Sequence, residues 1–300
     1  MQTRVEIADF ENWRAVAEGA ARIMREGEVV ALPTETVYGL GAVAFDPEAV
    51  ARVFEAKDRP SFDPLIVHIA GIRDLGRVAV VPAEVEDIVR QLAKAFWPGP
   101  LTMVLPKHED VPDLVTSGLP TVAVRVSKHE VMRYLTRELG PIAAPSANRF
   151  GRISPTSAGA VLRELDGRIP LVVDGGACSD GLESTIIAVE PGEKRPILRL
   201  LRPGPVTREE LQKFGKVPKV RRVTDDRPEA PGGLDSHYAP EVPVLLHKPN
   251  GLVQLCQVLY PKVVHPRREE RSQEGQVKVN NRRKPPHLSQ ASAEALVLLL

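Results

Sequence analysis

The sequence has few aromatic residues, few cysteines and almost no net charge. Phe, Trp and Tyr make up 4% of the 300 residues, and 40 basic side chains face 39 acidic ones, for a net charge of +1. This balance excludes a protein that binds nucleic acid through bulk positive charge, although it is compatible with a local basic pocket. The two cysteines, Cys178 and Cys256, are too few for a disulfide framework or a metal cluster.

Long apolar runs are also missing. No stretch approaches the roughly 18 apolar residues that span a bilayer, and the first residues, which include Glu6, Asp9 and Glu11, lack the apolar region of a signal peptide. We therefore expect a reduced, cytoplasmic protein with no membrane association. Proline is in excess, with 28 residues or about 9%, against the ~5% that is usual.

Helix and strand patterns alternate over most of the chain, and 43% hydrophobic residues can supply a core. Asp9, Asp46-Pro47, Ser154-Pro155 and Thr207 are typical helix starts. We expect helices at 10–26, 46–57, 82–96, 154–165 and 207–215. The expected strands are 29–32, 65–69, 101–105, 121–126, 142–144, 171–173, 185–189 and 197–201. Because several strands follow one another directly, we predict an α/β fold with a mixed sheet.

The regular pattern ends near residue 215, so we assign residues 1–215 to the main domain. Residues 216–241 are rich in proline and in basic residues, and we expect a linker or arm there. Residues 242–300 form a third, atypical segment. Within it, residues 262–284 hold eight basic and three acidic residues, a balance of +5 with few apolar side chains, so we expect partial disorder.

No P-loop, GxGxxG, HExxH, CxxC or GxSxG motif is present, so nothing indicates a nucleophile or a metal-bound hydrolase. Polar residues stand instead at the ends of expected strands, where α/β proteins build their sites. They occur in the loop 33–41, in 146–148, in 183–185 and at Arg202. Taken singly, these signals are weak, and an ordinary turn explains the loop 33–41 and the segment 146–148 better than a site does.

Charged and titratable side chains add to this set. Lys57 and Arg59 follow an expected helix, where extended backbone would point both the same way, although a helix C-terminus also favours cations. Arg125 lies within an apolar strand and needs an anionic partner, either an internal carboxylate or a substrate carboxylate. His68 faces away from Leu65 and Val67, as a structural histidine or as a ligand.

Together, Lys57, Arg59, Arg125 and Arg202 would line one basic cavity if the strand ends converge. Such a cavity suits a polyanion, either a small molecule such as a nucleoside triphosphate or an RNA backbone.

The motifs themselves resemble a known family. In order, the chain carries ALPTETVYGLG (31–41), FEAKDRP (54–60), DPLIVHIA (63–70), WPGPLTMVL (97–105), TVAVRV (121–126), PIAAPSAN (141–148), DGG (174–176), ESTI (183–186) and LRPGP (201–205). These resemble the YrdC-type threonylcarbamoyl-AMP synthases, and SHYAPEVPV (236–244) resembles the linker of their longer, two-domain members.

The resemblance implies a twisted mixed sheet with flanking helices around a deep, positively charged cavity. It implies that L-threonine, bicarbonate and ATP are converted to threonylcarbamoyl-AMP and pyrophosphate. A downstream tRNA threonylcarbamoyl transferase would pass the product to the adenosine next to the anticodon. Mg²⁺ would be bound through the phosphates of ATP and not by a protein metal site.

By position, the resemblance also implies roles for individual residues. The threonine pocket would contain Thr36, His68, Arg125, the backbone of Ala144, and Ser184. The ATP site would contain Lys57, Arg59, Asp63, Thr121, Ser146, Asn148, Ser154, Arg202 and His237. Of these, the catalytic set would be Lys57, Arg59, Ser146 and Asn148.

The sequence departs from the family in three places. Asp63 stands where the family usually has Asn, and a carboxylate there would repel phosphate unless it is protonated or bridged by Mg²⁺. Leu234, Asp235 and Ser236 replace the usual aromatic and basic residues before the HYAP run. Beyond about Leu246 we find no resemblance to the second domain of the family, so we expect a truncated or frame-shifted tail.

Two alternatives to the synthase remain. One is a protein that binds double-stranded RNA or tRNA in the same basic cavity. The other is a related module that transfers a carbamoyl group through carbamoyl-adenylate, against which the HYAP linker argues because it is typical of stand-alone synthases.

Overall fold

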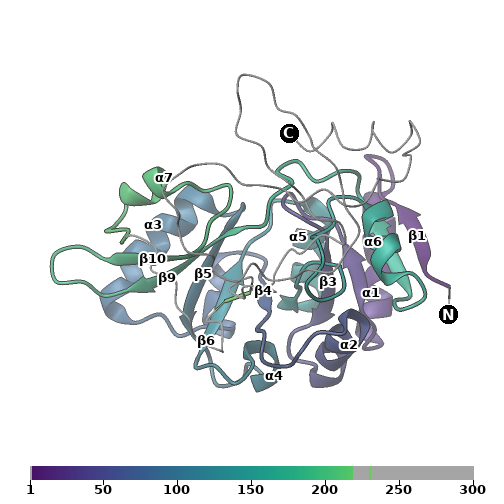
Figure 1. Cartoon of the computed structure of the whole chain (residues 1–300), viewed down its shortest axis with the longest axis horizontal. Coiled ribbons are helices and arrows are strands. Elements are labelled where there is room, and N and C mark those ends of the chain that lie inside the picture. Colours follow the sequence, from purple (N-terminus) through teal and green to yellow (C-terminus); the bar gives the residue numbers. More distant parts are fainter. Residues whose placement is uncertain (1, 219–229, 232–300) are drawn as a thin grey trace, which may run out of the picture. The chain divides into compact units, whose positions relative to one another are not determined.

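A computed structural model describes residues 2–218 and 230–231, and the chain divides into a unit of residues 1–239 and a unit of residues 240–300. The first unit is built on one ten-stranded sheet in the order β1-β8-β2-β3-β7-β4-β6-β5-β9-β10 (Figure 1). The strands are β1 (Arg4–Ile7), β2 (Val30–Leu32), β3 (Gly39–Val43), β4 (Ile66–His68), β5 (Leu101–Pro106), β6 (Thr121–Arg125), β7 (Ile142–Ala143), β8 (Leu171–Asp174), β9 (Thr185–Glu190) and β10 (Ile197–Arg202).

The sheet is mixed, as the sequence predicts. Strands β1 and β2 both run parallel to β8, β4 runs parallel to β6, and β5 runs parallel to β9, whereas the remaining neighbours are antiparallel. The parallel pair β4–β6 places His68 next to Arg125 in register. Two polar residues that are 57 positions apart in sequence therefore lie side by side.

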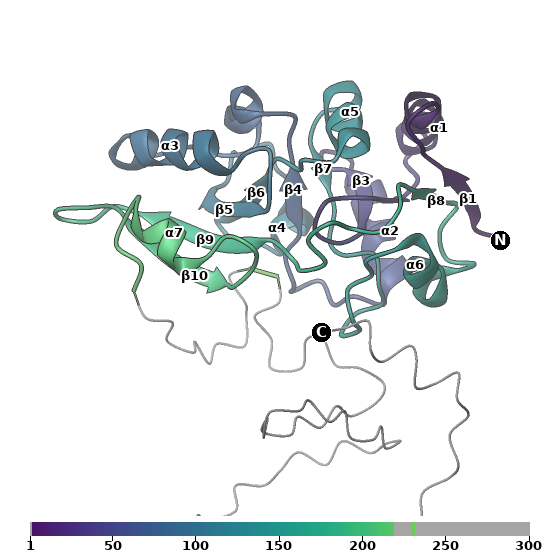
Figure 2. The ribbon, with the colours of Figure 1, turned by 90° about the horizontal axis from the view of Figure 1, so that it is seen from above.

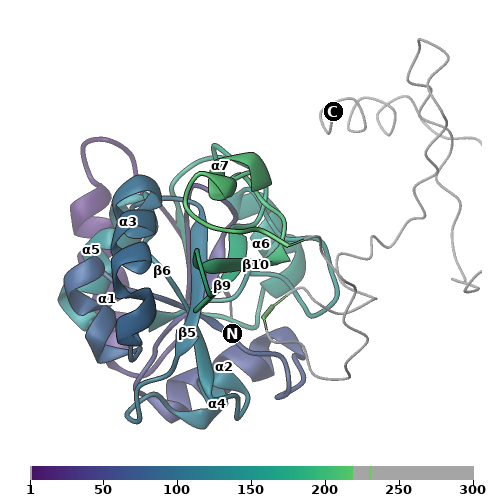
Figure 3. The ribbon, with the colours of Figure 1, turned by 90° about the vertical axis from the view of Figure 1, so that its left-hand side faces the viewer.

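Helices cover both faces of the sheet. They are α1 (Trp13–Arg25), α2 (Pro47–Lys57), α3 (Glu86–Phe96), α4 (Asp113–Thr116), α5 (Glu130–Leu139), α6 (Ala158–Leu165) and α7 (Arg208–Gln212), with short 3-10 turns at η1 (Ile72–Arg77) and η2 (Ala83–Val85). Figures 2 and 3 show α1, α3 and α5 on one face, with α2, α4 and α6 on the other. Alternate residues of β8 serve the two layers, since Leu171 and Val173 pack with α1 and α5, and Val172 packs in the larger core.

Two of the expected helix starts are confirmed. The carboxylate of Asp46 accepts hydrogen bonds from the backbone N–H groups of Glu48 and Ala49, at 3.0 and 3.1 Å, with Pro47 as the first helical residue. Thr207 and Glu210 form the capping box of α7. In both cases a side-chain oxygen pairs with an N–H that the helix itself leaves unpaired.

The other two expected starts are wrong. Helix α6 begins at Ala158 with Ser157 as its cap, because Ser154 turns away and donates to the carboxylate of Glu183. Helix α1 begins at Trp13, because Asp9 accepts hydrogen bonds from two N–H groups in the preceding turn.

Strand β3 lies partly in the segment 33–41 that the sequence presents as a loop. Two glycines, Gly39 and Gly41, weaken its strand signal. Packing around Gly41 is close, since a Cβ there would lie 2.8 Å from Cδ1 of Leu32 on β2 and the leucine side chain would have to shift. Within residues 2–218, no helix is long and apolar enough to cross a membrane.

A matched pair of glycine substitutions tests how closely the backbone packs around Gly204. A Cβ on Gly204 would lie 2.4 Å from the backbone nitrogen of Thr185 and 2.5 Å from the carbonyl oxygen of Glu183. We expect Gly204→Ala to lower the free energy of unfolding by about 1–3 kcal/mol, because backbone atoms must shift. Gly159→Ala in α6 meets no atom within 4 Å and should be neutral or stabilising. Urea denaturation of both variants measures the difference, and equal stability would contradict the packing.

Candidate functional site

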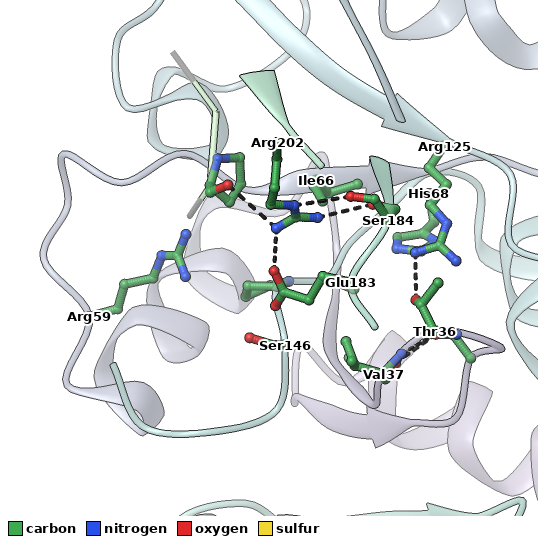
Figure 4. A pocket seen from close by; sticks show the side chains of 15 residues that line it. Thr36, Val37, Arg59, Ile66, His68, Arg125, Ser146, Glu183, Ser184 and Arg202 are labelled. Carbon is green, nitrogen blue, oxygen red and sulfur yellow. Dashed lines mark hydrogen bonds and ion pairs between the residues drawn. The ribbon is translucent and has the colours of Figure 1, made fainter. Parts of the chain in front are cut away.

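Residues from eight separate stretches of the chain line one cavity in the described part of the protein (Figure 4). The β2–β3 loop contributes Thr34 and Thr36, the segment after α2 contributes Arg59, and the segment after β7 contributes Ala144 and Ser146. The remaining lining residues are Val37, Gly39, Ile66, His68, Arg125, Pro145, Glu183, Ser184, Arg202 and Pro231. The strand ends therefore converge as the sequence analysis requires.

Arg125 at the end of β6 is buried and tightly held. Its Nε donates to the carbonyl oxygen of Gly99 at 3.2 Å, its Nη1 donates to the hydroxyl of Thr36 at 2.8 Å, and its Nη2 donates to Glu35 at 2.7 Å. The internal carboxylate that the sequence analysis left open therefore exists, and it is Glu35. A guanidinium carries five N–H donors, and three of them have partners among the described residues, so two remain there for a ligand carboxylate.

Glu35 is itself buried behind the cavity wall. Its second carboxylate oxygen accepts a hydrogen bond from the hydroxyl of Ser127 at 2.6 Å. Burial alone would raise the pKa of Glu35, but the positive charge of Arg125 and the two hydrogen bonds outweigh it and lower the pKa to about 2. Glu35 is therefore ionised at neutral pH and holds Arg125 in one orientation.

His68 stands beside Arg125 on β4 and is also buried. Burial, helped by the neighbouring positive charge of Arg125, lowers the pKa of His68 to about 3. The imidazole is therefore neutral at pH 7. Among the described residues its Nδ1 has no hydrogen-bond partner, so it can serve a polar ligand through hydrogen bonding and not through charge.

Arg202 at the end of β10 is anchored by the loop that precedes β9. Its Nε and Nη2 donate to the carbonyl oxygen and the hydroxyl of Ser184, both at 3.0 Å. Its Nη1 donates to the carboxylate of Glu183 and, at 3.4 Å, to the carbonyl oxygen of Pro231. Residues 230–231 thus reach the cavity from beyond the main domain assigned from the sequence.

Lys57 and Arg59 do not point the same way, in contrast to the expectation. Asp58 between them adopts a left-handed conformation (φ 50°), which ends α2 and turns the chain. Lys57 is fully buried and donates to the carbonyl oxygens of Ser146 and Asn148. These hydrogen bonds stabilise the backbone of the 146–148 loop. Burial, followed by repulsion from Arg59, lowers the pKa of Lys57 well below its usual value.

Arg59 does line the cavity, and it forms an ion pair with the buried Asp63 at 3.0 Å. Its Nε and Nη2 also donate to the carbonyl oxygens of Asp63 and Pro64. Burial raises the pKa of Asp63, against the opposing effect of Arg59. The carboxylate that departs from the family pattern therefore faces Arg59 and is not among the residues that line the cavity.

The structure brings most of the predicted site residues together. Those that line the cavity are Thr36, Arg59, His68, Arg125, Ala144, Ser146, Ser184 and Arg202. Five others are not among the residues that line it, namely Lys57, Asp63, Thr121, Asn148 and Ser154, and Thr121 lies at the opposite end of β6 from Arg125. His237 lies outside the described residues.

Sequence reasoning missed the two carboxylates that complete the site. Glu35 and Glu183 stand next to Thr36 and Ser184, which were assigned from the motifs, yet neither received a role. The signal was available, because a buried arginine requires an anionic partner and each carboxylate lies within a polar loop. Arg59, Arg125 and Arg202 each face a carboxylate, so the strongly positive character of the cavity stays a prediction.

Comparison with known proteins gives one consistent result. The Sua5/YciO/YrdC family model, described as telomere recombination, matches residues 22–204, and a model described as the C-terminal domain of threonylcarbamoyl-AMP synthase matches residues 206–295. The chain is 48% identical over 242 residues to the threonylcarbamoyl-AMP synthase of Pyrococcus abyssi and 45% identical over 232 residues to that of Bacillus subtilis.

These matches cover 79% and 76% of this chain, and 68% and 65% of the relatives. The chain thus spans about two thirds of the length of the curated relatives it matches. The crystal structure of P. abyssi Sua5 complexed with L-threonine superposes with a TM-score of 0.70 at 45% identity, covering 80% of this chain and 70% of that one.

The C-terminal match extends to residue 295, beyond residue 246, where the sequence analysis ended the resemblance. The boundaries of the linker at 216–241 and the nature of residues 242–300 stay predictions, since these residues lie almost wholly outside the described part.

The buried pair of Glu35 and Arg125 predicts a specific pH dependence. A carboxylate whose pKa falls from 4.5 to about 2 on folding stabilises the native state above pH 4.5, and this stabilisation is lost as the pH falls toward 2. Glu35→Gln should therefore lower the free energy of unfolding by about 3 kcal/mol at pH 7. The difference from the wild type should shrink between pH 4.5 and pH 2 in denaturant titrations.

Glu190→Gln is the matched control, because Glu190 pairs with Arg199 at 2.8 Å in a half-exposed position. Half-exposed pairs contribute about 0–1 kcal/mol, so this variant should differ little from the wild type at pH 7. A deficit in Glu35→Gln that does not change between pH 7 and pH 2 would contradict the assigned ion pair.

Proposed function

This chain belongs to the Sua5/YciO/YrdC family, and we propose that it is a threonylcarbamoyl-AMP synthase that joins L-threonine, bicarbonate and ATP. One observation carries the proposal. A single cavity joins Arg125, which keeps two free N–H donors beside a neutral histidine, to Arg59 and Arg202, whose guanidinium groups suit phosphate. The cavity therefore places groups that suit an amino-acid carboxylate next to groups that suit the phosphates of a nucleotide.

The Arg125 end suits the amino acid. A threonine carboxylate can accept from the two remaining N–H groups of Arg125, while Glu35 holds the guanidinium from behind. The neutral imidazole of His68 and the hydroxyl groups of Thr36 and Ser184 can pair with the threonine hydroxyl and amine. The backbone of Ala144 completes this wall.

The Arg59 and Arg202 end suits the phosphates, with Ser146 between the two halves of the cavity. In the proposed reaction the threonine amine and bicarbonate form a carbamate with loss of water. A carbamate oxygen then attacks the α-phosphorus of ATP, and the bond to pyrophosphate breaks. The residues that line the cavity supply position and positive charge, and no protein nucleophile is needed. Mg²⁺ enters as part of the MgATP substrate.

The proposal also includes the fate of the product. The unstable acyl-adenylate would pass to a tRNA threonylcarbamoyl transferase in the cytoplasm. We assign no residue of the cavity to bicarbonate.

The RNA-binding alternative is not favoured, because each arginine of the cavity faces a carboxylate and does not form an open basic surface.

Pyrophosphate release tests the proposed reaction. With ATP and Mg²⁺, release should require both L-threonine and bicarbonate, and leaving out either should reduce it to background. L-Serine, which lacks the methyl group, should support a lower rate, since one methyl contact is worth about 10-fold or more. Release that does not depend on threonine would overturn the proposal.

A charge-conserving variant tests the threonine end. Arg125→Lys keeps the pairing with Glu35 but loses the planar, bidentate donors. The KM for threonine should rise roughly 10- to 100-fold, with a much smaller change in the KM for ATP. Arg199→Lys on β10, which pairs with Glu190 away from the cavity, is the control and should change neither. An equal loss for both substrates would remove Arg125 from the threonine pocket.

A further inference from the structure

Among the described residues that line the cavity, one has a carboxylate, and this is Glu183. Both of its oxygens are engaged, since one accepts from Nη1 of Arg202 and the other accepts from the hydroxyl of Ser154 at 2.7 Å. The side chains of Glu183 and Arg202 are 12% and 8% exposed. Figure 4 shows Glu183 between Arg202 and Ser146. A negative charge at this point opposes the binding of a polyphosphate.

Glu183 is not needed to orient Arg202. The carbonyl oxygen and the hydroxyl of Ser184 already hold Nε and Nη2, which fixes the plane of the guanidinium. The Ser184 hydroxyl is in turn held by Thr102 at 2.7 Å. What Glu183 adds is therefore charge, because it neutralises Arg202 and engages a second donor on Ser154.

The cavity is also too small for a nucleotide as it stands. Its volume is about 30 Å³, whereas pockets for small molecules usually measure roughly 300–1,000 Å³. Side chains must therefore move before a nucleotide can bind. Glu183 is the lining side chain that a phosphate would repel, and its two donors are those that an incoming phosphate oxygen could take over.

We propose that Glu183 is an internal anion that occupies Arg202 and Ser154 and that the polyphosphate must displace. It thereby sets the affinity of the site for ATP and pyrophosphate. The proposal rests on the function proposed above for the identity of the ligands. A carboxylate that returns to Arg202 also keeps the arginine from being left as a buried, unpaired charge when pyrophosphate leaves. Glu183 thus lowers the affinity for polyphosphate and favours the release of pyrophosphate.

The test is direct binding of ATP and of pyrophosphate, each with Mg²⁺, by isothermal titration calorimetry. Glu183→Gln is isosteric and its amide oxygen can still accept a hydrogen bond, so the loop should fold. We expect both ligands to bind about tenfold more tightly than to the wild type, because the competing negative charge is gone. The Kd for L-threonine should not change.

Glu183→Asp provides a second, independent reading. It keeps the charge but shortens the side chain by one methylene, so the carboxylate can no longer reach both Arg202 and Ser154. It should bind pyrophosphate more tightly than the wild type, with a smaller gain than Glu183→Gln. The control is Glu190→Gln on β9, which removes the same charge outside the cavity and should leave both Kd values unchanged.

Equal or weaker binding of ATP and pyrophosphate by folded Glu183 variants would overturn the inference and show that the carboxylate supports the phosphate site. If the wild type binds neither ligand, the proposed function fails and this inference fails with it. Tight binding by the wild type without threonine-dependent turnover would contradict the proposed function alone.

Discussion

The structure of this site depends on placing three arginines at the end of a hydrophobic sheet, where an unpaired charge would be strongly unfavourable. The fold meets this requirement with one carboxylate for each arginine: Arg125 with Glu35, Arg59 with Asp63 and Arg202 with Glu183. Each carboxylate contacts only part of its guanidinium, and other donors of Arg125 and Arg202 pair with nearby hydroxyl and carbonyl groups. The positive charges of these arginines are therefore balanced by neighbouring carboxylates, just as basic and acidic residues are balanced over the whole sequence.

The three pairs differ in position, and this difference gives the two ends of the cavity different properties. Glu35 and Asp63 lie behind the wall, where they fix the arginines without meeting the ligand, whereas Glu183 lies in the lining itself. Lys57 stabilises the 146–148 loop, because its ammonium group donates to the carbonyl oxygens of Ser146 and Asn148. Rigid support on the threonine side and an exchangeable anion on the phosphate side are what a reaction based on positioning requires.

Much of this arrangement could be predicted from the sequence where the information is local. The alternation in strands 65–69 and 121–126 set His68 and Arg125 each opposite the apolar face of its own strand, and the cap at Asp46 set the start of α2. What could not be predicted depends on contacts between distant segments. The pairing of Glu35 with Arg125 joins residues 90 positions apart, and the buried Lys57 donates to the carbonyl oxygens of Ser146 and Asn148, 89 and 91 positions away. Ser154 looked like a helix cap because its true partner, Glu183, lies 29 positions away.

At the threonine end, Arg125 should bind the substrate carboxylate while it stays paired with Glu35. A crystal structure of this chain with L-threonine tests it most directly. In that structure the threonine carboxylate should accept hydrogen bonds from Arg125 while the 2.7 Å pair between Arg125 and Glu35 stays intact. Threonine bound elsewhere, or Arg125 turned away from Glu35 to reach it, would contradict the account.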